Sequence, residues 1–315
     1  MAQTVESHPV SVRVRQGRQF HDADSNYPLP NDIEEHHRLT SQHEAIKLIV
    51  GANYTAPLPQ LNDGTGPKSI LDIGTGSGQW VIDISNEFPM AKAVGIDLSE
   101  PSIDKSTIPE RVSFVVGDIV KALPFESASF DVVHMRMLPS FQHRAMLYKE
   151  VHRILRPGGI IQLVEPGEFA SRVDPNMPEL AAFQAAIIKS RHVQAARAPT
   201  SDEDAAPAAK KTWSMAYTIT DDLKDAPRLW TSVNDEWIHM PIGVWSDDEA
   251  GQKAGKYFQQ CTVGLAKGLG ITFVDDGILT EEEVNKIVAG LETRMEEGKK
   301  SQIEWPFCYA WARKL

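Results

Sequence analysis

The sequence predicts an α/β protein with a doubly wound, mostly parallel sheet. Short apolar segments alternate with helical segments between residues 69 and 164. The first apolar segment, 69–73, leads directly into a loop with glycines at alternate positions, and an acidic residue stands at or just after the end of each of the next two. Strands that alternate with helices in this way form parallel sheets with helices on both faces.

Each predicted strand is a short apolar run that stops at a glycine, an acidic residue or a histidine, as buried parallel strands do. The five expected strands are 69–73, 93–97, 112–116, 130–134 and 160–164. Helices are expected at 79–88 and at 145–155, and the Pro-Gly-Gly sequence at 157–159 ends the second helix.

The flanking regions divide the chain into four parts. Residues 1–60 are expected to hold a polar, mobile arm (1–26) and a helix over 33–50 that ends at Gly51, and 61–169 form the core. Residues 170–228 are expected to be a cap with a low-complexity insert at 195–211. Residues 229–315 are expected to complete the same sheet, with a strand at 229–240 and inserted helices at 247–269 and 280–298.

Composition excludes several classes of protein. The formal net charge of -11 disfavours a nucleic-acid partner, because an acidic surface repels phosphates. The two cysteines have no partners at zinc-ligand spacing, so neither a metal site nor a disulfide framework is expected. No secretory h-region or run of about 18 apolar residues is present, so the expected location is cytoplasmic and no membrane contact is predicted.

The glycine loop is the strongest functional signal. Asp72 opens it, and Gly74, Thr75, Gly76, Ser77 and Gly78 follow. Alternate glycines let the backbone turn tightly and approach a ligand, and the N–H groups of the next helix favour an anionic carboxylate. Asp72 has the charge to accept an ammonium group, so the loop suits an amino acid moiety.

Two further acidic residues extend this site along the sheet edge. Asp97, followed by Leu98, ends the second strand and has the oxygens to accept a ribose diol. Asp118, followed by Ile119, comes after the third strand, where its carboxylate could accept from an adenine amine while Ile119 packs on the ring. Two alternatives remain open: the glycines are turns and the acids helix caps, or the ligand is a nicotinamide dinucleotide, whose G-x-G-x-x-G spacing differs from the G-x-G-x-G seen here.

Five motifs together resemble those of the class I S-adenosylmethionine-dependent methyltransferases. They are ILDIGTGSGQW at 70–80, GIDLS at 95–99, GDI at 117–119, FDVVH at 130–134 and RPGG at 156–159. The resemblance is strongest to the LaeA-like fungal group, through YPLPNDIEEHHRLTSQHEAIKLIVG at 27–51 and the segments at 239–245, 281–295 and 305–315.

The resemblance implies a Rossmann-like, seven-stranded sheet whose last strand, 303–313, is antiparallel. It implies S-adenosyl-L-methionine as the cofactor, bound by Asp72, the loop from Gly74 to Gly78, Asp97 and Asp118. It also implies that the N-terminal helix closes over the cofactor as a lid and brings Tyr27, Arg38 and Gln42 near the site.

Candidates for the chemistry of methyl transfer lie after the fourth strand. His134 is the first choice for a base or substrate ligand, because a histidine titrates near neutral pH. Arg136 has the geometry to hold a substrate carboxylate, and His143 is a further candidate. For each, a packing or loop-fixing role is the alternative, and Glu165 is expected to fix a loop more than to bind substrate.

The expected function is methylation of a small-molecule acceptor, most simply on oxygen, in fungal secondary metabolism. A LaeA-like nuclear regulator that acts through protein partners is the alternative from another class, and a third is a methyltransferase fold with a non-methylating reaction. The sequence leaves open whether the protein is a monomer or a homodimer.

Overall fold

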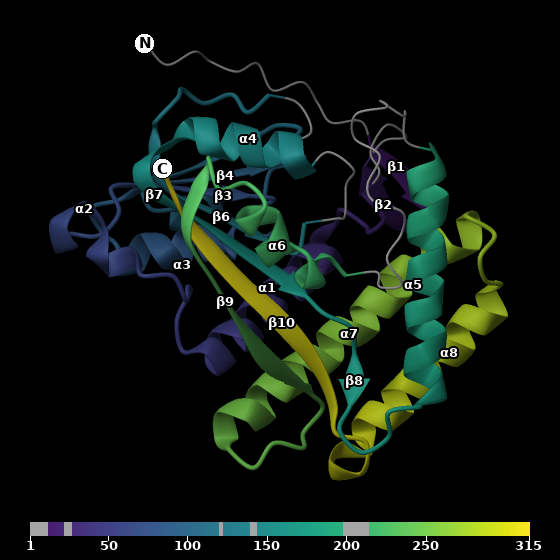
Figure 1. Cartoon of the computed structure of the whole chain (residues 1–315). Coiled ribbons are helices and arrows are strands. Elements are labelled where there is room, and N and C mark those ends of the chain that lie inside the picture. The colour runs from purple at the N-terminus through teal and green to yellow at the C-terminus, as the bar shows by residue number, and fades with distance from the viewer. Residues whose placement is uncertain (1–11, 22–26, 120–121, 139–143, 198–213) are drawn as a thin grey trace.

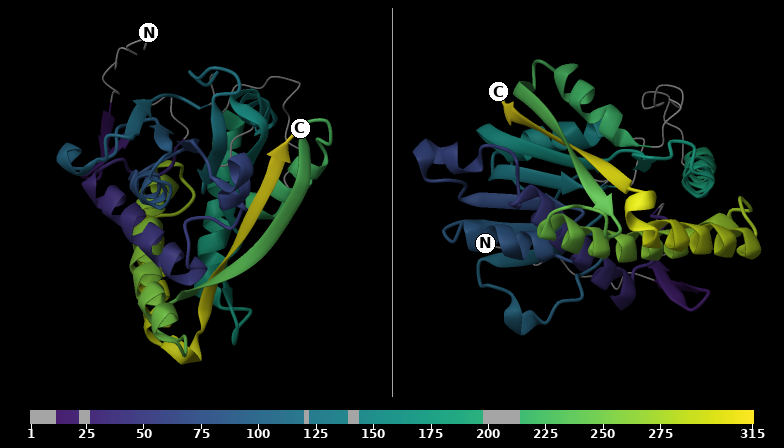
Figure 2. Two further views of the ribbon diagram at one scale, coloured as in Figure 1. Left: turned by 90° about the vertical axis from the view of Figure 1, so that its left-hand side faces the viewer. Right: turned by 90° about the horizontal axis from the view of Figure 1, so that it is seen from below.

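The computed structural model of the chain describes residues 12–21, 27–119, 122–138, 144–197 and 214–315 (Figure 1). It confirms the α/β class. A mixed sheet has the strand order β5-β4-β3-β6-β7-β10-β8, and β9 pairs with β10. Helices cover both faces of this sheet (Figures 1 and 2).

The five predicted parallel strands are all present and pair in parallel with their neighbours. They are β3 (Ser69–Ile73), β4 (Lys92–Asp97), β5 (Val112–Val116), β6 (Phe130–Arg136) and β7 (Leu155–Pro166). Strand β7 begins five residues earlier than predicted. The Pro-Gly-Gly sequence ends helix α4 as expected but also forms the start of this strand, with an irregular register against β6.

The C-terminal part adds the predicted antiparallel strand. Strand β10 (Ile303–Lys314) runs antiparallel to β7 and to β9 (Trp230–Ile242), and the β9–β10 pair forms one side of the sheet in Figure 2. The seven strands implied by the resemblance are therefore present. The two-residue strand β8 (Ala170–Ser171) adds an eighth, which is too short for any pattern to reveal.

The longer helices are α1 (Ile33–Val50), α3 (Gln79–Glu87), α4 (Arg144–Ile154), α5 (Pro178–Arg197), α6 (Ile219–Lys224), α7 (Glu249–Asp275) and α8 (Glu281–Glu296). A short segment labelled α2 (Leu61–Gly64) precedes β3. Helix α3 packs on one sheet face, where Trp80 and Ile84 contact the same core as Ile70 and Val132. Helices α4 and α6 pack on the other face. None of the helices in the described ranges is long and apolar enough to cross a membrane.

Helix α1 has the bounds and caps that the sequence predicts. The Asp32 side chain accepts a hydrogen bond from the Glu35 N–H at the start, and Gly51 ends the helix with a left-handed φ of 76°. Ala45 and Ile46 of α1 are buried in the same core cluster as Phe258 of α7. Because these contacts are apolar and fully buried, α1 is built into the core as well as lying before the first core strand.

The expectation of a mobile arm over 1–26 is wrong for residues 12–21. These form a β-hairpin of β1 (Val12–Arg15) and β2 (Arg18–His21). Val12 and Val14 alternate with arginines, and Gln16 and Gly17 have φ angles of 46° and 78°, which suit a two-residue hairpin turn. The remaining arm residues, and 198–211 of the predicted insert, lie outside the described residues.

Candidate active site

The glycine loop between β3 and α3 has the backbone conformation that its alternating glycines predict. Gly74, Gly76 and Gly78 have φ angles of 73°, 53° and 73°. Residues with a Cβ atom rarely adopt these angles, so glycine is required at each position. Thr75 is buried, and its Oγ1 has no hydrogen-bond partner among the described residues. The loop is a tight turn with an unused polar atom.

Two leucines cover this loop. A Cβ atom on Gly76 would lie 3.0 Å from Leu39 Cδ1 of α1, and one on Gly74 would collide with Leu138 Cδ2 in the segment after β6. The N-terminal helix and the end of β6 therefore both reach the loop, as expected for walls of a ligand cleft.

Asp97 connects the end of β4 to the glycine loop. Its Oδ2 accepts a hydrogen bond from the Gly76 N–H at 2.8 Å, and its Oδ1 accepts one from the Leu98 N–H at 2.7 Å. Burial raises the pKa of Asp97, and the N–H donors oppose that shift. Each carboxylate oxygen keeps a second lone pair. The predicted bond to a ribose diol is therefore compatible with this geometry and stays a prediction.

Asp118 and Ile119 follow β5, the strand next to β4 at the same sheet edge. Ile119 is partly buried against the core cluster that contains Leu71 and Met135. The predicted order of acidic residues along the edge, with Asp72 on β3, Asp97 on β4 and Asp118 after β5, is therefore found in the structure. Their roles toward adenine and ribose stay predictions.

Asp72 and His134 form a buried pair on adjacent strands. They lie opposite each other in the β3–β6 register, and His134 Nδ1 is 2.7 Å from Asp72 Oδ1. The imidazole is 1% exposed and stacks on Trp80, with ring centroids 3.8 Å apart. Burial lowers the pKa of His134, so the imidazole is neutral near pH 7 and its Nδ1–H donates. This geometry favours a role for His134 in orienting Asp72 over a role as a base. The predicted catalytic role of His134 stays a prediction.

Arg136 ends β6 one residue beyond the pairing of Ile73 with Met135, which places it beside Gly74. Its two terminal nitrogens both lie 3.3 Å from His43 Nδ1 of α1. The next residue, Met137, has a φ of 54°, a left-handed angle that costs energy for a side chain of this size and is often found at functional sites.

The N-terminal residues named from the resemblance also lie at this edge. The hydroxyl of Tyr27 is close enough to Asp97 and Arg38 for both charges to influence its pKa, which burial raises. Arg38 holds Glu35 through two hydrogen bonds of 2.8 and 2.5 Å, and its Nη1 is buried without a partner among the described residues. Gln42 is buried, and its Nε2 is also unpartnered there.

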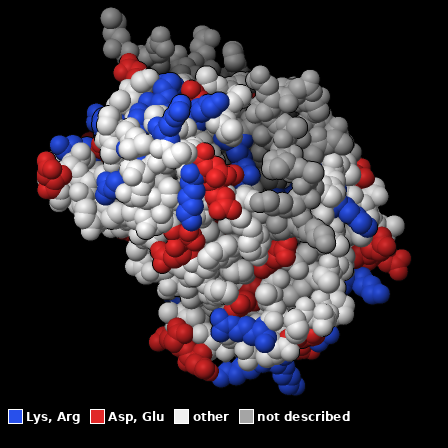
Figure 3. All heavy atoms as spheres, in the orientation of Figure 1, with Lys and Arg blue, Asp and Glu red and all other residues white. Residues whose placement is uncertain are grey.

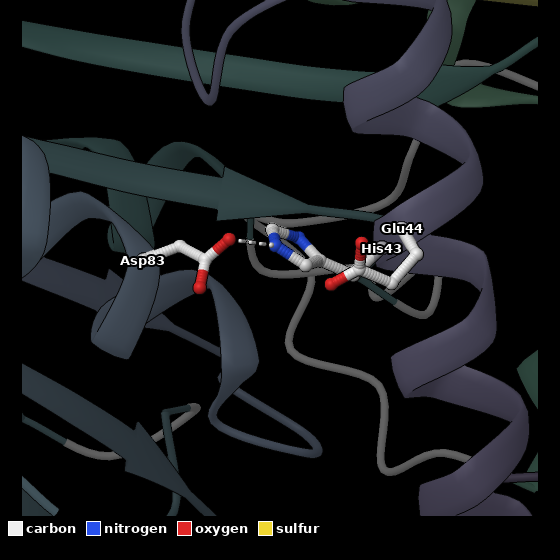
Figure 4. A group of neighbouring side chains, drawn as sticks. All are labelled: His43, Glu44 and Asp83. Carbon is white, nitrogen blue, oxygen red and sulfur yellow. Dashed lines mark hydrogen bonds and ion pairs between the residues drawn. The ribbon is translucent and has the colours of Figure 1, made fainter. Parts of the chain in front are cut away.

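His43, which the sequence places only in a group of N-terminal histidines, is central to a polar network (Figure 4). Its Nε2 lies 3.3 Å from Asp83 Oδ2 of α3, while Lys47 Nζ contacts the same oxygen. Glu44 offers a third donor for a metal ion. The arrangement does not favour a metal, because Arg136 occupies His43 Nδ1 and Lys47 already neutralises Asp83.

A small pocket adjoins the loop at the carboxyl ends of β6 and β7. Its walls are largely apolar, with Glu165 and Tyr148 as buried polar residues; the lining residues are Met135, Leu138, Arg144, Leu147, Tyr148, Leu163, Glu165, Met215 and Ile219. Glu165 accepts a hydrogen bond from the Leu138 N–H at 3.2 Å, so the expected loop-fixing contact is present. Burial raises the pKa of Glu165 to about 8, and the charge of Arg191 opposes this shift.

The structure thus brings together most of the residues singled out in the sequence. His143 lies outside the described residues. Sequence reasoning missed Leu39, Tyr309 and the place of His43. Tyr309 belongs to the terminal strand β10, far from the glycine loop in the sequence. Nothing in the sequence around it distinguishes it from a core tyrosine.

Comparison with known proteins agrees with this geometry. Residues 70–159 match the family model described as a methyltransferase domain. The chain is 33% identical over 142 residues to the secondary metabolism regulator laeA of Coprinopsis cinerea, covering 44% of this chain and 35% of that protein. It is 33% identical over 167 residues to the N-methyltransferase verN of Clonostachys rogersoniana (50% and 57% covered), and 35% identical over 168 residues to the methyltransferase pytC of Aspergillus terreus (52% and 49%).

The matches show a methyltransferase domain over residues 70–159, and its glycine loop has the features of the class I S-adenosylmethionine-dependent methyltransferases. Within fungi the chain is similar to the LaeA regulators, with 26% to 33% identity to those of Coprinopsis cinerea and Aspergillus flavus. The chain spans about half the length of the curated relatives it matches. The matched share is 35% of the Coprinopsis cinerea protein and 61% of the laeA regulator of Aspergillus flavus.

S-adenosylmethionine is the cofactor of this class, and the residues present fit it. The loop glycines hold the left-handed angles of a close backbone approach. Polar atoms without partners among the described residues lie on the loop, on α1 and on β10; they are Thr75 Oγ1, Gln42 Nε2, Arg38 Nη1 and Tyr309 OH. Buried polar groups are normally satisfied, so these atoms are free to bond a polar ligand.

Proposed function

We propose that this chain transfers the methyl group of S-adenosylmethionine to a small organic acceptor, on oxygen, in fungal secondary metabolism. The observation that carries the proposal is the position of Leu138. This residue packs on Gly74 of the glycine loop and also lines the apolar pocket that contains Glu165. A cofactor site and a small apolar pocket therefore share a wall.

The cofactor supplies a methyl group that is already activated on a sulfonium, so the chain has to position the acceptor, exclude water and accept a proton. The pocket walls contributed by Leu147, Leu163 and Ile219 are apolar and exclude water. Glu165 is the buried carboxyl group of this pocket, and burial raises its pKa to about 8. It is therefore mostly protonated at pH 7, but its ionised form is a stronger base than an ordinary carboxylate and is able to take a proton from a hydroxyl group. We assign the proton-accepting role to Glu165 rather than to His134, whose Nδ1 is bonded to Asp72.

The resemblance and the geometry together support an assignment of the cofactor residues. We propose that Asp72, Gly74, Thr75, Gly76 and Gly78 face the amino acid part of the cofactor. Asp97 with Leu98 faces the ribose, and Asp118 with Ile119 faces the adenine. Tyr27, Arg38 and Gln42 cover the site from α1 and the segment before it.

The names of the relatives support methylation, and they also support the alternative of a regulator that acts through protein partners. One is named as an N-methyltransferase and one as a regulator of secondary metabolism. The apolar pocket favours a small acceptor over a protein acceptor. Acidic and basic side chains are interspersed on the face drawn in Figure 3, as suits a surface that does not bind a phosphate backbone. A cytoplasmic location stays a prediction.

A labelling experiment tests the proposal. The purified protein is incubated with S-adenosylmethionine that carries an isotopic methyl label and with a metabolite extract of the source organism, and the products are separated by mass. Label in a low-mass product is the expected result, and acid- and base-stable label would place it on an ether oxygen, a nitrogen or a carbon, which NMR of the product separates. Label found only in proteins, or in no product although the cofactor binds, contradicts the proposal.

A further inference from the structure

Arg136 has an unusual charge environment for an arginine inside a protein. Both terminal nitrogens bond one neutral imidazole nitrogen, His43 Nδ1, and no ion pair joins Arg136 to an Asp or Glu of the described residues. Asp72 is the acidic residue that acts on it electrostatically, and burial lowers the pKa of Arg136. A half-buried arginine without a bonded carboxylate carries a desolvation cost, and binding of an anion would offset that cost.

The register of the sheet places a second donor in the same row. Arg136 of β6 lies opposite Val164 of β7, and Val164 lies opposite Tyr309 of β10. Residues that are directly opposite in neighbouring strands have side chains on the same face. Tyr309 is 3% exposed, its OH has no partner among the described residues, and its charge state is sensitive to Arg136. A guanidinium and an unused phenol therefore lie on one sheet face, one strand apart from each other.

Helix α1 closes this face. Its Ala45 and Ile46 share a core cluster with Val164 and Tyr309. His43 of the same helix contacts Arg136, and Gln42, next to it, is buried with its Nε2 unpartnered in the described part of the chain. The polar groups on this face thus come from the end of β6 and from β10, with α1 packed over them, so an anion bound by Arg136 and Tyr309 would lie between the sheet and the helix.

We propose that Arg136 and Tyr309 bind the carboxylate of the methionine part of S-adenosylmethionine, while Asp72 faces its ammonium group. This inference rests on cofactor binding at the glycine loop, as given under the proposed function. Arg136 stands beside Gly74, and Asp72 precedes that loop on the neighbouring strand, so a positive and a negative side chain flank the place where an amino acid group would lie. An Arg and a carboxylate form two parallel hydrogen bonds, and the phenol OH adds a donor.

The proposal gives α1 a defined role in cofactor recognition. His43 Nδ1 accepts from the guanidinium and so sets its orientation, while His43 Nε2 is tied to Asp83 of α3. The amino acid part of the cofactor would therefore be held by an arginine whose position depends on the contact between α1 and the core.

Two ligands distinguish the carboxylate site from the rest of the cleft. S-adenosylhomocysteine has the amino acid group, whereas 5′-methylthioadenosine has the same adenosine and thioether but lacks it. Their dissociation constants are measured by calorimetry for the unaltered protein, Arg136→Met, Arg136→Lys and Tyr309→Phe. Arg111→Met is the matched control, because Arg111 bonds Ser85 and Asn86 outside this cleft.

Arg136→Met is expected to weaken S-adenosylhomocysteine at least about tenfold, the effect of losing charge-assisted hydrogen bonds, and to leave 5′-methylthioadenosine within about twofold. Arg136→Lys is expected to show a smaller loss, and Tyr309→Phe a loss of about fivefold for S-adenosylhomocysteine alone. Unchanged binding of S-adenosylhomocysteine by Arg136→Met, or equal losses for both ligands, would overturn the proposal. If both ligands bind as expected but no acceptor is methylated, the proposed function fails and this inference stands.

Discussion

His134 donates a hydrogen bond to Asp72 at 2.7 Å while its ring stacks 3.8 Å from Trp80. The pair joins β6 to β3 directly below the glycine loop. A neutral imidazole that is bonded on one side and stacked on its face fixes the direction of the Asp72 carboxylate. We therefore treat His134 as a positioning residue for the ammonium-binding acid.

Replacement of His134 tests this relationship. His134→Phe keeps an aromatic ring against Trp80 but leaves the buried Asp72 carboxylate without its donor, which costs about 1–3 kcal/mol of stability. We expect a lower melting temperature and weaker binding of S-adenosylhomocysteine. His134→Gln, which can donate a hydrogen bond, should recover part of both losses. If His134→Phe binds and melts like the unaltered protein, the pair has no positioning role.

The glycine loop provides a second test. Gly76 has a φ of 53°, and a Cβ there would lie 3.0 Å from Leu39 Cδ1. Gly76→Val therefore combines backbone strain of about 1–2 kcal/mol with a collision against α1, and we expect S-adenosylhomocysteine binding to be lost in calorimetry. Adding Leu39→Ala relieves the collision and not the strain, so stability should improve more than affinity. Normal binding by Gly76→Val alone would place the ligand elsewhere.

The sequence predicts those elements whose signals lie within a few neighbouring residues. The five parallel strands and helix α1 are predictable because apolar period, caps and glycines all act over a few residues. The hairpin at 12–21 was missed because its signal is two valines and a Gln-Gly turn within a polar stretch. Tyr309 and the Arg136–His43 contact depend on strand register and helix packing over a distance of 93 residues or more, which no local pattern contains.

Glu165 makes the stability of the fold depend on pH, and this dependence is measurable without knowledge of the methyl acceptor. Its pKa in the folded protein is about 8, above the ordinary value of 4.5, so the folded state keeps its proton after the unfolded state has lost it. The resulting stability is complete below pH 4.5 and is lost as the pH rises toward 8. Glu165→Gln removes this effect. In thermal unfolding measured from pH 5 to pH 8, the variant should gain stability relative to the unaltered protein as the pH rises, with an increase of about 2–4 °C in Tm for each kcal/mol. A constant difference across this range would show that Glu165 is not held protonated.

His43 makes the stability of the fold depend on pH in the opposite direction. Burial lowers its pKa to about 4 from 6.5, against the opposing effect of Asp83 and with the help of the charges on Arg136 and Lys47. Below pH 6.5 the unfolded state binds a proton that the folded state does not, so stability falls as the pH falls toward 4. The full shift corresponds to about 3 kcal/mol. His43→Gln keeps an acceptor and a donor but cannot titrate, so urea titrations at pH 7 and pH 5 should show a smaller loss for the variant. Equal losses would mean that His43 does not contribute to the acid sensitivity.

Truncation tests whether α1 is a lid or part of the core. From the sequence alone, deletion of residues 1–50 is expected to leave a folded core with weaker cofactor binding. The structure changes this expectation, because Ala45 and Ile46 are fully buried against α7 and the side chain of Thr272 donates to the backbone of Pro28. Exposure of this apolar surface should lower stability by several kcal/mol, since each buried aliphatic side chain contributes about 1.5–3 kcal/mol. We predict that the truncated protein is insoluble or melts far below the full chain.

Hydrogen exchange on the full chain distinguishes a lid from a core helix more sharply. Amides of 33–50 should be protected without ligand and only slightly more so with S-adenosylhomocysteine, whereas a mobile lid would exchange fast when free and slowly when bound. A soluble truncated protein with unchanged melting temperature would restore the lid interpretation.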